Sequence, residues 1–212
     1  MKKFSNTYIF LYISGLVLVV AVLLSLVSIK LKPLQTRNQE LEQRQQILKA
    51  AGYTEMPKRQ ISRWYDKHIQ EMTLASKDGQ QLPLYVLKDN KTIYIIPVQG
   101  KGLWGPIGGY VALDSDGNIV VGAAFSHKSE TPGLGAEITT EKFQSQFKGK
   151  TIFDEEQQFV SVAVAKGGAE RNNLNPEHTV DAISGATITS KGVDAMLRKS
   201  LQPYAEALHH IK

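Results

Sequence analysis

A long uncharged apolar run near the N-terminus constrains this chain more than any other feature. The run extends from Tyr8 to Ile29, a stretch of 22 residues without a charged side chain. As an α-helix rising 1.5 Å per residue it would be about 33 Å long, which is enough to cross a bilayer core of roughly 30 Å. We therefore predict an N-terminal transmembrane anchor at residues 1–31.

The alternative for the same run is a cleaved signal peptide. Its length exceeds the ~7–15 apolar residues usual in the central part of such a peptide. Residues 25–28, Ser-Leu-Val-Ser, are also a poor match to the small-x-small pattern of a cleavage site. The lysines on the two sides of the run are nearly balanced, so the flanking charges do not predict an orientation. We expect the run to remain in the mature protein.

A second helix is predicted from Lys32 to Ala51. Pro33 would begin this helix and Gly52 would end it. Its leucines recur at heptad spacing, at Leu34, Leu41 and Leu48. Three heptad positions are too few to predict a coiled coil. We interpret residues 32–57 as a membrane-exit helix or linker, whose narrow apolar stripe could instead pack on a partner protein.

The remaining residues, 58–212, are predicted to form one α+β domain. Apolar spacings of three and four predict an amphipathic helix from Pro57 to Leu74. Strand patterns bounded by turn signals occur at residues 82–87, 92–98, 110–113, 119–127 and 160–165. A short helix at 140–147 and a long one from Val193 to Leu208 complete the pattern. Because the strands and helices do not alternate as βαβ units, an α+β fold is favoured over a parallel α/β fold.

Composition excludes several classes of function. The chain has no cysteine, which excludes disulfides, thiolate nucleophiles and a cysteine-ligated iron–sulfur cluster within it. The net charge of +5 arises from basic residues that are mixed with acidic ones, so a nucleic-acid surface is not predicted. His127 and His178 lack a second ligand at metal-binding spacing, and we predict no metal site.

One stretch near the C-terminus combines glycine with many hydroxyl groups. Between residues 181 and 190, four hydroxyl side chains fall within seven positions, namely Ser184, Thr187, Thr189 and Ser190. Gly185 would let a ligand approach the main chain closely, and the predicted helix that follows would offer free N–H groups to a phosphate. A simple helix N-cap explains the same residues. From spacing alone, both interpretations stay open.

Three motifs together resemble a known family. Residues 181–187, Asp-x-x-Ser-Gly-Ala-Thr, resemble the flavinylation motif of bacterial FMN-binding domains. Residues 130–135, Glu-Thr-Pro-Gly-Leu-Gly, resemble that family's loop beside the flavin, and residues 102–107 form a third match. The resemblance implies that Thr187 carries FMN through a phosphoester bond. It implies further cofactor contacts from Ser184, Gly185, Ala186, Thr189, Glu130, Thr131, Leu134 and Trp104.

The segment from Gly100 to Gly105 also satisfies Gly-x-Gly-x-x-Gly, the dinucleotide-binding pattern. That fingerprint requires a helix to begin there, whereas Pro106, Gly108 and Gly109 follow, and then a strand. We therefore predict a flexible loop that presents Trp104. This side chain would pack either in the core or against the flavin.

With the predicted anchor, the chain resembles the C subunits of the sodium-pumping NADH:quinone oxidoreductase. That resemblance implies an inner-membrane protein whose FMN-binding domain lies in the periplasm. It implies an electron relay from an intramembrane iron–sulfur centre to the FMN of the B subunit, with the A, B, D, E and F subunits as partners. A separate flavin transferase would attach the FMN, and Asp181 would serve its recognition.

Other functions compete with this one. The G subunit of the Rnf complex shares the flavin motif and the Glu130–Gly135 loop, although Gly102-Leu103-Trp104 and the opening Asn6-Thr7-Tyr8 favour the sodium pump. A stand-alone membrane-anchored FMN protein and a membrane protein without a redox role are the remaining alternatives. No catalytic residue is predicted, because no nucleophile–base pair stands out. The apolar run contains no acidic residue and the chain shows no NADH site, so any enzymatic activity would belong to a complex.

Overall fold

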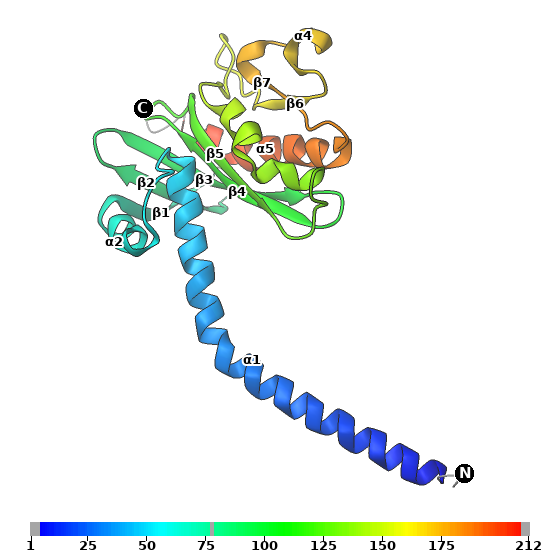
Figure 1. Ribbon diagram of the computed structural model, residues 1–212. Helices are drawn as coiled ribbons and strands as arrows, with labels where there is room; N and C mark the ends of the chain where they lie inside the picture. Colours follow the sequence, from blue (N-terminus) through cyan, green and yellow to red (C-terminus); the bar gives the residue numbers. More distant parts are fainter. Residues whose placement is uncertain (1–4, 77–78, 209–212) are drawn as a thin grey trace. The chain divides into compact units, whose positions relative to one another are not determined.

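The computed structural model of the protein describes residues 5–76 and 79–208 (Figure 1). The chain divides into two compact units, one ending at Glu42 and one beginning at Gln43. Each is described by itself. The α+β fold predicted from the sequence is confirmed, with a long N-terminal apolar helix followed by a domain built on a five-stranded antiparallel sheet.

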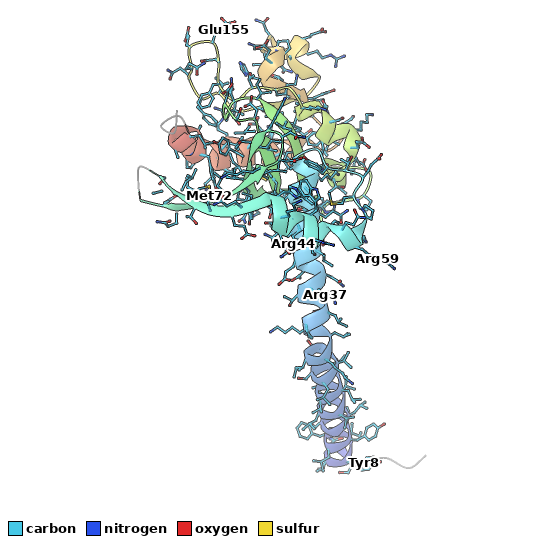
Figure 2. The ribbon with its side chains drawn as sticks, turned by 90° about the vertical axis from the view of Figure 1, so that its left-hand side faces the viewer. Tyr8, Arg37, Arg44, Arg59, Met72 and Glu155 are labelled. Atoms are coloured by element: carbon cyan, nitrogen blue, oxygen red, sulfur yellow. The ribbon has the colours of Figure 1, made fainter. Side chains whose placement is uncertain are left out.

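The helix α1 (Asn6–Ala50) contains the whole apolar run. Within the described residues it is the one helix long and apolar enough to cross a membrane. All residues of the run are exposed, as a lipid-facing helix requires. Figure 2 labels Tyr8 in the apolar part and Arg37 in the polar part that follows.

The prediction that Pro33 begins a second helix was wrong, because Pro33 lies inside α1. A proline removes one backbone donor and strains the preceding turn, but the flanking turns continue. The Thr36 hydroxyl donates to the Lys32 carbonyl at 3.1 Å beside it. The predicted end at Gly52 is confirmed. Gly52 has φ +93, and its N–H and that of Tyr53 close the last turn on the carbonyls of Lys49 and Leu48.

Five consecutive strands form the sheet in chain order. They are β1 (Ile69–Ala75), β2 (Gln81–Lys88), β3 (Thr92–Lys101), β4 (Pro106–Leu113) and β5 (Val120–His127). The four strands predicted in this region correspond to β2–β5. The tight turn between β3 and β4 closes with the Gly102 N–H on the Gly105 carbonyl at 2.8 Å, so the glycine-rich segment is a hairpin turn and not a dinucleotide site.

The strand β1 corrects the sequence prediction of one helix reaching Leu74. The helix α2 (Lys58–His68) ends six residues earlier, and Ile69 is extended with φ −100 and ψ 126. All seven residues of β1 pair in register with β2, from Ile69 opposite Leu87 to Ala75 opposite Gln81. This pairing outweighs the helical spacing of the apolar residues, which local pattern alone cannot reveal.

Helices cover both faces of the sheet. The helix α5 (Thr187–Leu208) packs on one face, where Val193, Met196 and Leu197 join the core that contains Ile96. The other face contains Ile95, which packs with α2 and with Ile47, Leu48, Ala50 and Ala51 at the end of α1. Neighbouring residues of β3 thus point into different cores, as strand geometry requires.

The connections from β5 to α5 contain only short elements. After β5 come the 3-10 turn η1 (Gly135–Thr139), α3 (Glu141–Gln144) and the 3-10 turn η2 (Ser145–Phe147), where one short helix was predicted. The strands β6 (Ala163–Ala165) and β7 (Thr179–Asp181) pair in parallel, and between them in the chain come α4 (Gly168–Asn172) and the 3-10 turn η3 (Pro176–His178). Figure 1 labels β6, β7 and α4. The strand predicted from Val160 is shorter than expected, because Ser161 takes a positive φ of 64. β7 delivers the chain directly to the hydroxyl-rich stretch.

Candidate functional site

The hydroxyl-rich stretch joins the end of β7 to the start of α5. Gly185 has φ +78, a left-handed conformation that suits glycine. The helix begins at Thr187, six residues before the predicted start, and the Ser190 N–H donates to the Ala186 carbonyl at 2.9 Å. The N–H groups of the first turn lie N-terminal to the first intrahelical bonds, at the positive end of the helix dipole. This geometry suits a phosphate.

The structure separates the hydroxyl groups that the sequence could not distinguish. Thr189 and Ser190 are each only 2% exposed, whereas Ser184 and Thr187 are exposed. The Thr189 hydroxyl donates to Glu130 Oε2 at 2.6 Å, and Ser190 Oγ accepts the Ile183 N–H at 3.1 Å. Within the described part of the chain, Thr187 is therefore the accessible hydroxyl on the first turn of α5.

Glu130 lies beneath this turn and is 4% exposed. Besides the Thr189 hydroxyl, its carboxylate accepts the backbone N–H of Trp104 at 2.9 Å through Oε1. Its own N–H donates to His127 Nδ1 at 3.2 Å. One side chain thus connects the β3–β4 turn, the loop after β5 and the start of α5.

The pKa of the Glu130 carboxyl results from opposing effects. Burial raises it, but hydrogen bonds from the Thr189 hydroxyl and from the N–H groups of Trp104 and Gly105, with a smaller contribution from His127, lower it below its ordinary value of 4.5. Donors that favour the ionised form therefore outweigh desolvation. The site holds a buried carboxylate in its charged state at neutral pH.

This lowered pKa predicts an acid-dependent loss of stability. The ionised carboxylate stabilises the fold fully above the ordinary pKa of 4.5, and this stabilisation disappears as the pH falls through the lower folded-state value. We expect the difference in free energy of unfolding between the native chain and Glu130→Gln to shrink below that ordinary value. Urea unfolding across the acidic range measures it. A difference that stays constant with pH would contradict the assignment.

Four large apolar side chains are exposed on the segments that meet at Glu130. They are Leu103, Trp104, Leu134 and Ile188, at 44%, 66%, 42% and 58% exposure. Trp104 therefore does not pack in the core, so one of the two alternatives predicted from the sequence is excluded. Leu134 closely approaches Gly185, since a Cβ added there would lie 2.9 Å from Leu134 Cδ2. Ile188 directly follows Thr187 and Leu134 lies against Gly185, so two of these exposed apolar side chains are close to Thr187.

Thr131 and Asp181, two further predicted site residues, are exposed. The Thr131 carbonyl accepts the N–H groups of Leu134 and Ala136, both at 3.1 Å, which shapes the loop. Asp181 Oδ1 accepts the Gly167 N–H at 2.9 Å, and the Asp181 N–H donates to Gln146 Oε1 at 2.9 Å. Gln146 was not predicted as a site residue, because a hydrogen bond between its side-chain amide and the backbone of a residue far along the chain produces no pattern in the sequence.

A groove of about 470 Å³ adjoins the stretch on the Asp181 side. Asp181, Ala182, Ile183 and Ser184 form one wall, and residues of η1, α3 and η2 form the other. His127 and His178 lie apart in hydrogen bonds of their own, the latter with Thr151. No group of three metal-binding side chains occurs among the residues that the structure describes.

Comparison with known proteins identifies the family. The FMN-binding domain family matches residues 102–202, which include all three motifs. The C subunit of the Na(+)-translocating NADH-quinone reductase of Pseudomonas aeruginosa is 30% identical, covering 85% of each chain. The chain belongs to the family of these C subunits. The corresponding protein of Vibrio vulnificus is 43% identical over 112 residues, which span 42% of that relative and 52% of this chain.

Solved structures of C subunits agree with the fold. The crystal structure of the C subunit of Na(+)-translocating NADH-quinone reductase from Parabacteroides distasonis superposes with a TM-score of 0.76 at 39% identity, covering 84% of this chain and 96% of that one. A Shewanella oneidensis structure with a TM-score of 0.69 is 24% identical and supports the fold alone. This member of the family therefore carries an FMN-binding domain, as its motifs predicted.

Proposed function

We propose that this chain is a covalently flavinylated electron carrier, with FMN joined to Thr187 through a phosphoester bond. The observation that carries the proposal is the exposure of Thr187 at the start of α5, while Thr189 and Ser190 are buried and engaged. A transferase can reach only an exposed hydroxyl. The first-turn N–H groups would then bind the phosphate beside that bond.

The other residues around Thr187 fit a flavin. When bound, FMN supplies reversible electron transfer, and the protein supplies attachment and environment. Trp104, Leu134 and Ile188 offer apolar surface on which an aromatic ring can pack and exclude water from one side. Gly185 is exposed and carries no side chain, so a ligand can approach its main chain, whereas Ala186 is buried and would offer its backbone alone. Ser184, exposed beside them, can donate a hydrogen bond to the phosphate.

The proposed setting is the bacterial inner membrane, with α1 as a single-pass anchor and the flavin domain in the periplasm. The relatives' name describes a Na(+)-translocating NADH-quinone reductase. We infer that this chain assembles with the other subunits of such a complex. It would relay electrons from an intramembrane iron–sulfur centre to the FMN of the B subunit, while NADH oxidation and quinone reduction take place on other subunits.

Purification from native membranes tests this proposal. The expected result is one FMN added to the chain with loss of one water, measured by intact mass, and co-purification of the sodium-pump subunits. Co-purification with Rnf subunits would assign the chain to the Rnf complex in place of the sodium pump, and its role as an electron carrier would stand. A chain without flavin, from a host that has the transferase, would overturn the function.

Asp181 offers a separate test of transferase recognition. Asp181→Asn keeps an oxygen that can accept the Gly167 N–H, so the turn should persist, but it removes an exposed charge. A charge-assisted hydrogen bond contributes about 1.5–3 kcal/mol, so the initial rate of flavinylation should fall roughly 10–100-fold. Timed co-expression followed by mass spectrometry measures this rate. Asp114→Asn, at the β4–β5 turn, serves as the control, and equal rates for both variants would exclude the role.

A further inference from the structure

The Glu130 carboxylate has a structural arrangement that flavin contact does not explain. Oε1 accepts the Trp104 N–H and Oε2 accepts the Thr189 hydroxyl, and the side chain is 4% exposed. A residue that binds a ligand at the surface would turn an oxygen outward. Here both oxygens point into the protein.

Glycines surround this carboxylate. A Cβ added to Gly102 would lie 2.6 Å from Oε1, and one added to Gly135 would collide with Oε2 and lie 2.6 Å from Thr189 Oγ1. A Cβ on Gly192 of α5 would collide with the Lys101 carbonyl. Side chains at these positions would separate the β3–β4 turn from α5. The close approach of the three segments thus depends on glycine and on the one carboxylate between them.

The hydrogen bonds of the Glu130 carboxylate join two parts of the site, the β3–β4 turn through the N–H groups of Trp104 and Gly105 and the start of α5 through the Thr189 hydroxyl. Trp104 is on a hairpin turn with its side chain 66% exposed, and Thr189 lies two residues after Thr187 on α5. Because the carboxylate accepts from both, movement of the turn away from the helix would leave one oxygen of a buried charged group without its donor, which is unfavourable. The buried Glu130 carboxylate thereby fixes the position of Trp104 relative to Thr187.

We propose that Glu130 is a positioning residue, a buried brace that holds the Trp104 turn against the start of α5 and does not itself contact the flavin. Its consequence for the cofactor rests on the proposed attachment at Thr187, but the brace exists in the chain without flavin. Trp104 is then the residue that meets the ligand, and Glu130 acts through it.

The backbone amide of Trp104 provides a direct test in the unmodified, flavin-free chain. Its N–H should exchange slowly with deuterium although the Trp104 side chain is exposed, because the donor is bonded to a buried carboxylate. The N–H of Leu103, for which no hydrogen bond is described, serves as the reference within the same turn. Exchange of Trp104 as fast as Leu103 would overturn the brace.

Variants extend the test to the side chain. The chain has two tryptophans, so a Trp64→Phe background leaves Trp104 as the one tryptophan, whose emission is excited selectively at wavelengths that tyrosine does not absorb. In that background and without flavin, Glu130→Gln and Thr189→Val should lower the fluorescence anisotropy of Trp104, whereas Thr189→Ser should retain the native value. If Glu130→Gln does not fold, the test of the brace rests on Thr189→Val, which removes only the hydroxyl that bonds the Glu130 carboxylate.

The outcomes separate the brace from the proposed function. Native anisotropy in folded Thr189→Val, or a loss of anisotropy that Thr189→Ser does not reverse, would overturn the brace. A change seen only in the flavin-loaded chain would make Glu130 a flavin ligand instead. Because the decisive measurements need no flavin, absence of the adduct would overturn the carrier role and leave the test of the brace intact.

Discussion

The Thr187→Ala chain should carry no covalent FMN, while its fold remains native. Thr187 is exposed, so its hydroxyl contributes little to the core. Thr189 and Ser190 cannot replace it, because each is 2% exposed. Bringing either to the surface would break a buried hydrogen bond and cost about 1–3 kcal/mol, besides unwinding the helix start. Intact mass of protein co-expressed with the transferase measures the result, which should be a complete loss.

Two matched variants make this loss specific. Ser184→Ala removes the other exposed hydroxyl of the motif and should keep the adduct, and Thr187→Ser retains a hydroxyl at the same place. Peptide mapping should locate the added mass on residue 187 alone. An adduct on Ser184, or one that persists in Thr187→Ala, would overturn the attachment site.

Features with local signals were predictable from the sequence. The apolar run needs only length and hydrophobicity to indicate a spanning helix, and residues 110–113 and 119–127 need only their local strand patterns and turn signals to indicate β4 and β5. Elements that depend on distant partners were not. The strand β1 exists because it pairs along all of β2. The end of α1 is buried because Ile47 and Leu48 share one apolar core with Ile95 and Ala124 of the sheet.

The same distinction applies to the site. The motifs were sufficient to predict an FMN-binding domain and to bring Glu130 and Thr187 into one region. They could not show that Thr189 faces inward and bonds Glu130, because that depends on which face of α5 packs on β3. The sequence suggested a role beside the flavin for Glu130, and the structure places its carboxylate below the surface. The geometry of a buried hydrogen bond becomes visible only when three separate segments are brought together.

The second large effect that we expect concerns the end of α1, because fragments that keep it and fragments that lack it should differ in stability. A fragment beginning at Lys32 should be soluble without detergent and fully folded, because it lacks the apolar run but keeps every core residue of the unit that begins at Gln43. A fragment beginning at Gly52 loses Ile47, Leu48, Ala50 and Ala51, all of which are buried against the sheet. It also loses the ion pair of Arg44 with Asp66 at 3.0 Å (Arg44 is labelled in Figure 2).

The size of that loss can be estimated from Ile47 and Leu48 alone. Burying each large aliphatic side chain contributes about 1.5–3 kcal/mol, so the two contribute roughly 3–6 kcal/mol. Domains are stable by only about 5–15 kcal/mol, and at this size each 1 kcal/mol shifts Tm by about 2–4 °C. The Gly52 fragment should therefore unfold roughly 6–24 °C below the Lys32 fragment, or not fold at all, as circular dichroism would measure. Equal Tm values would show that packing of the end of α1 on the sheet does not stabilise the domain. If the Lys32 fragment were insoluble while the full chain needed no detergent, the prediction of a membrane anchor would be wrong.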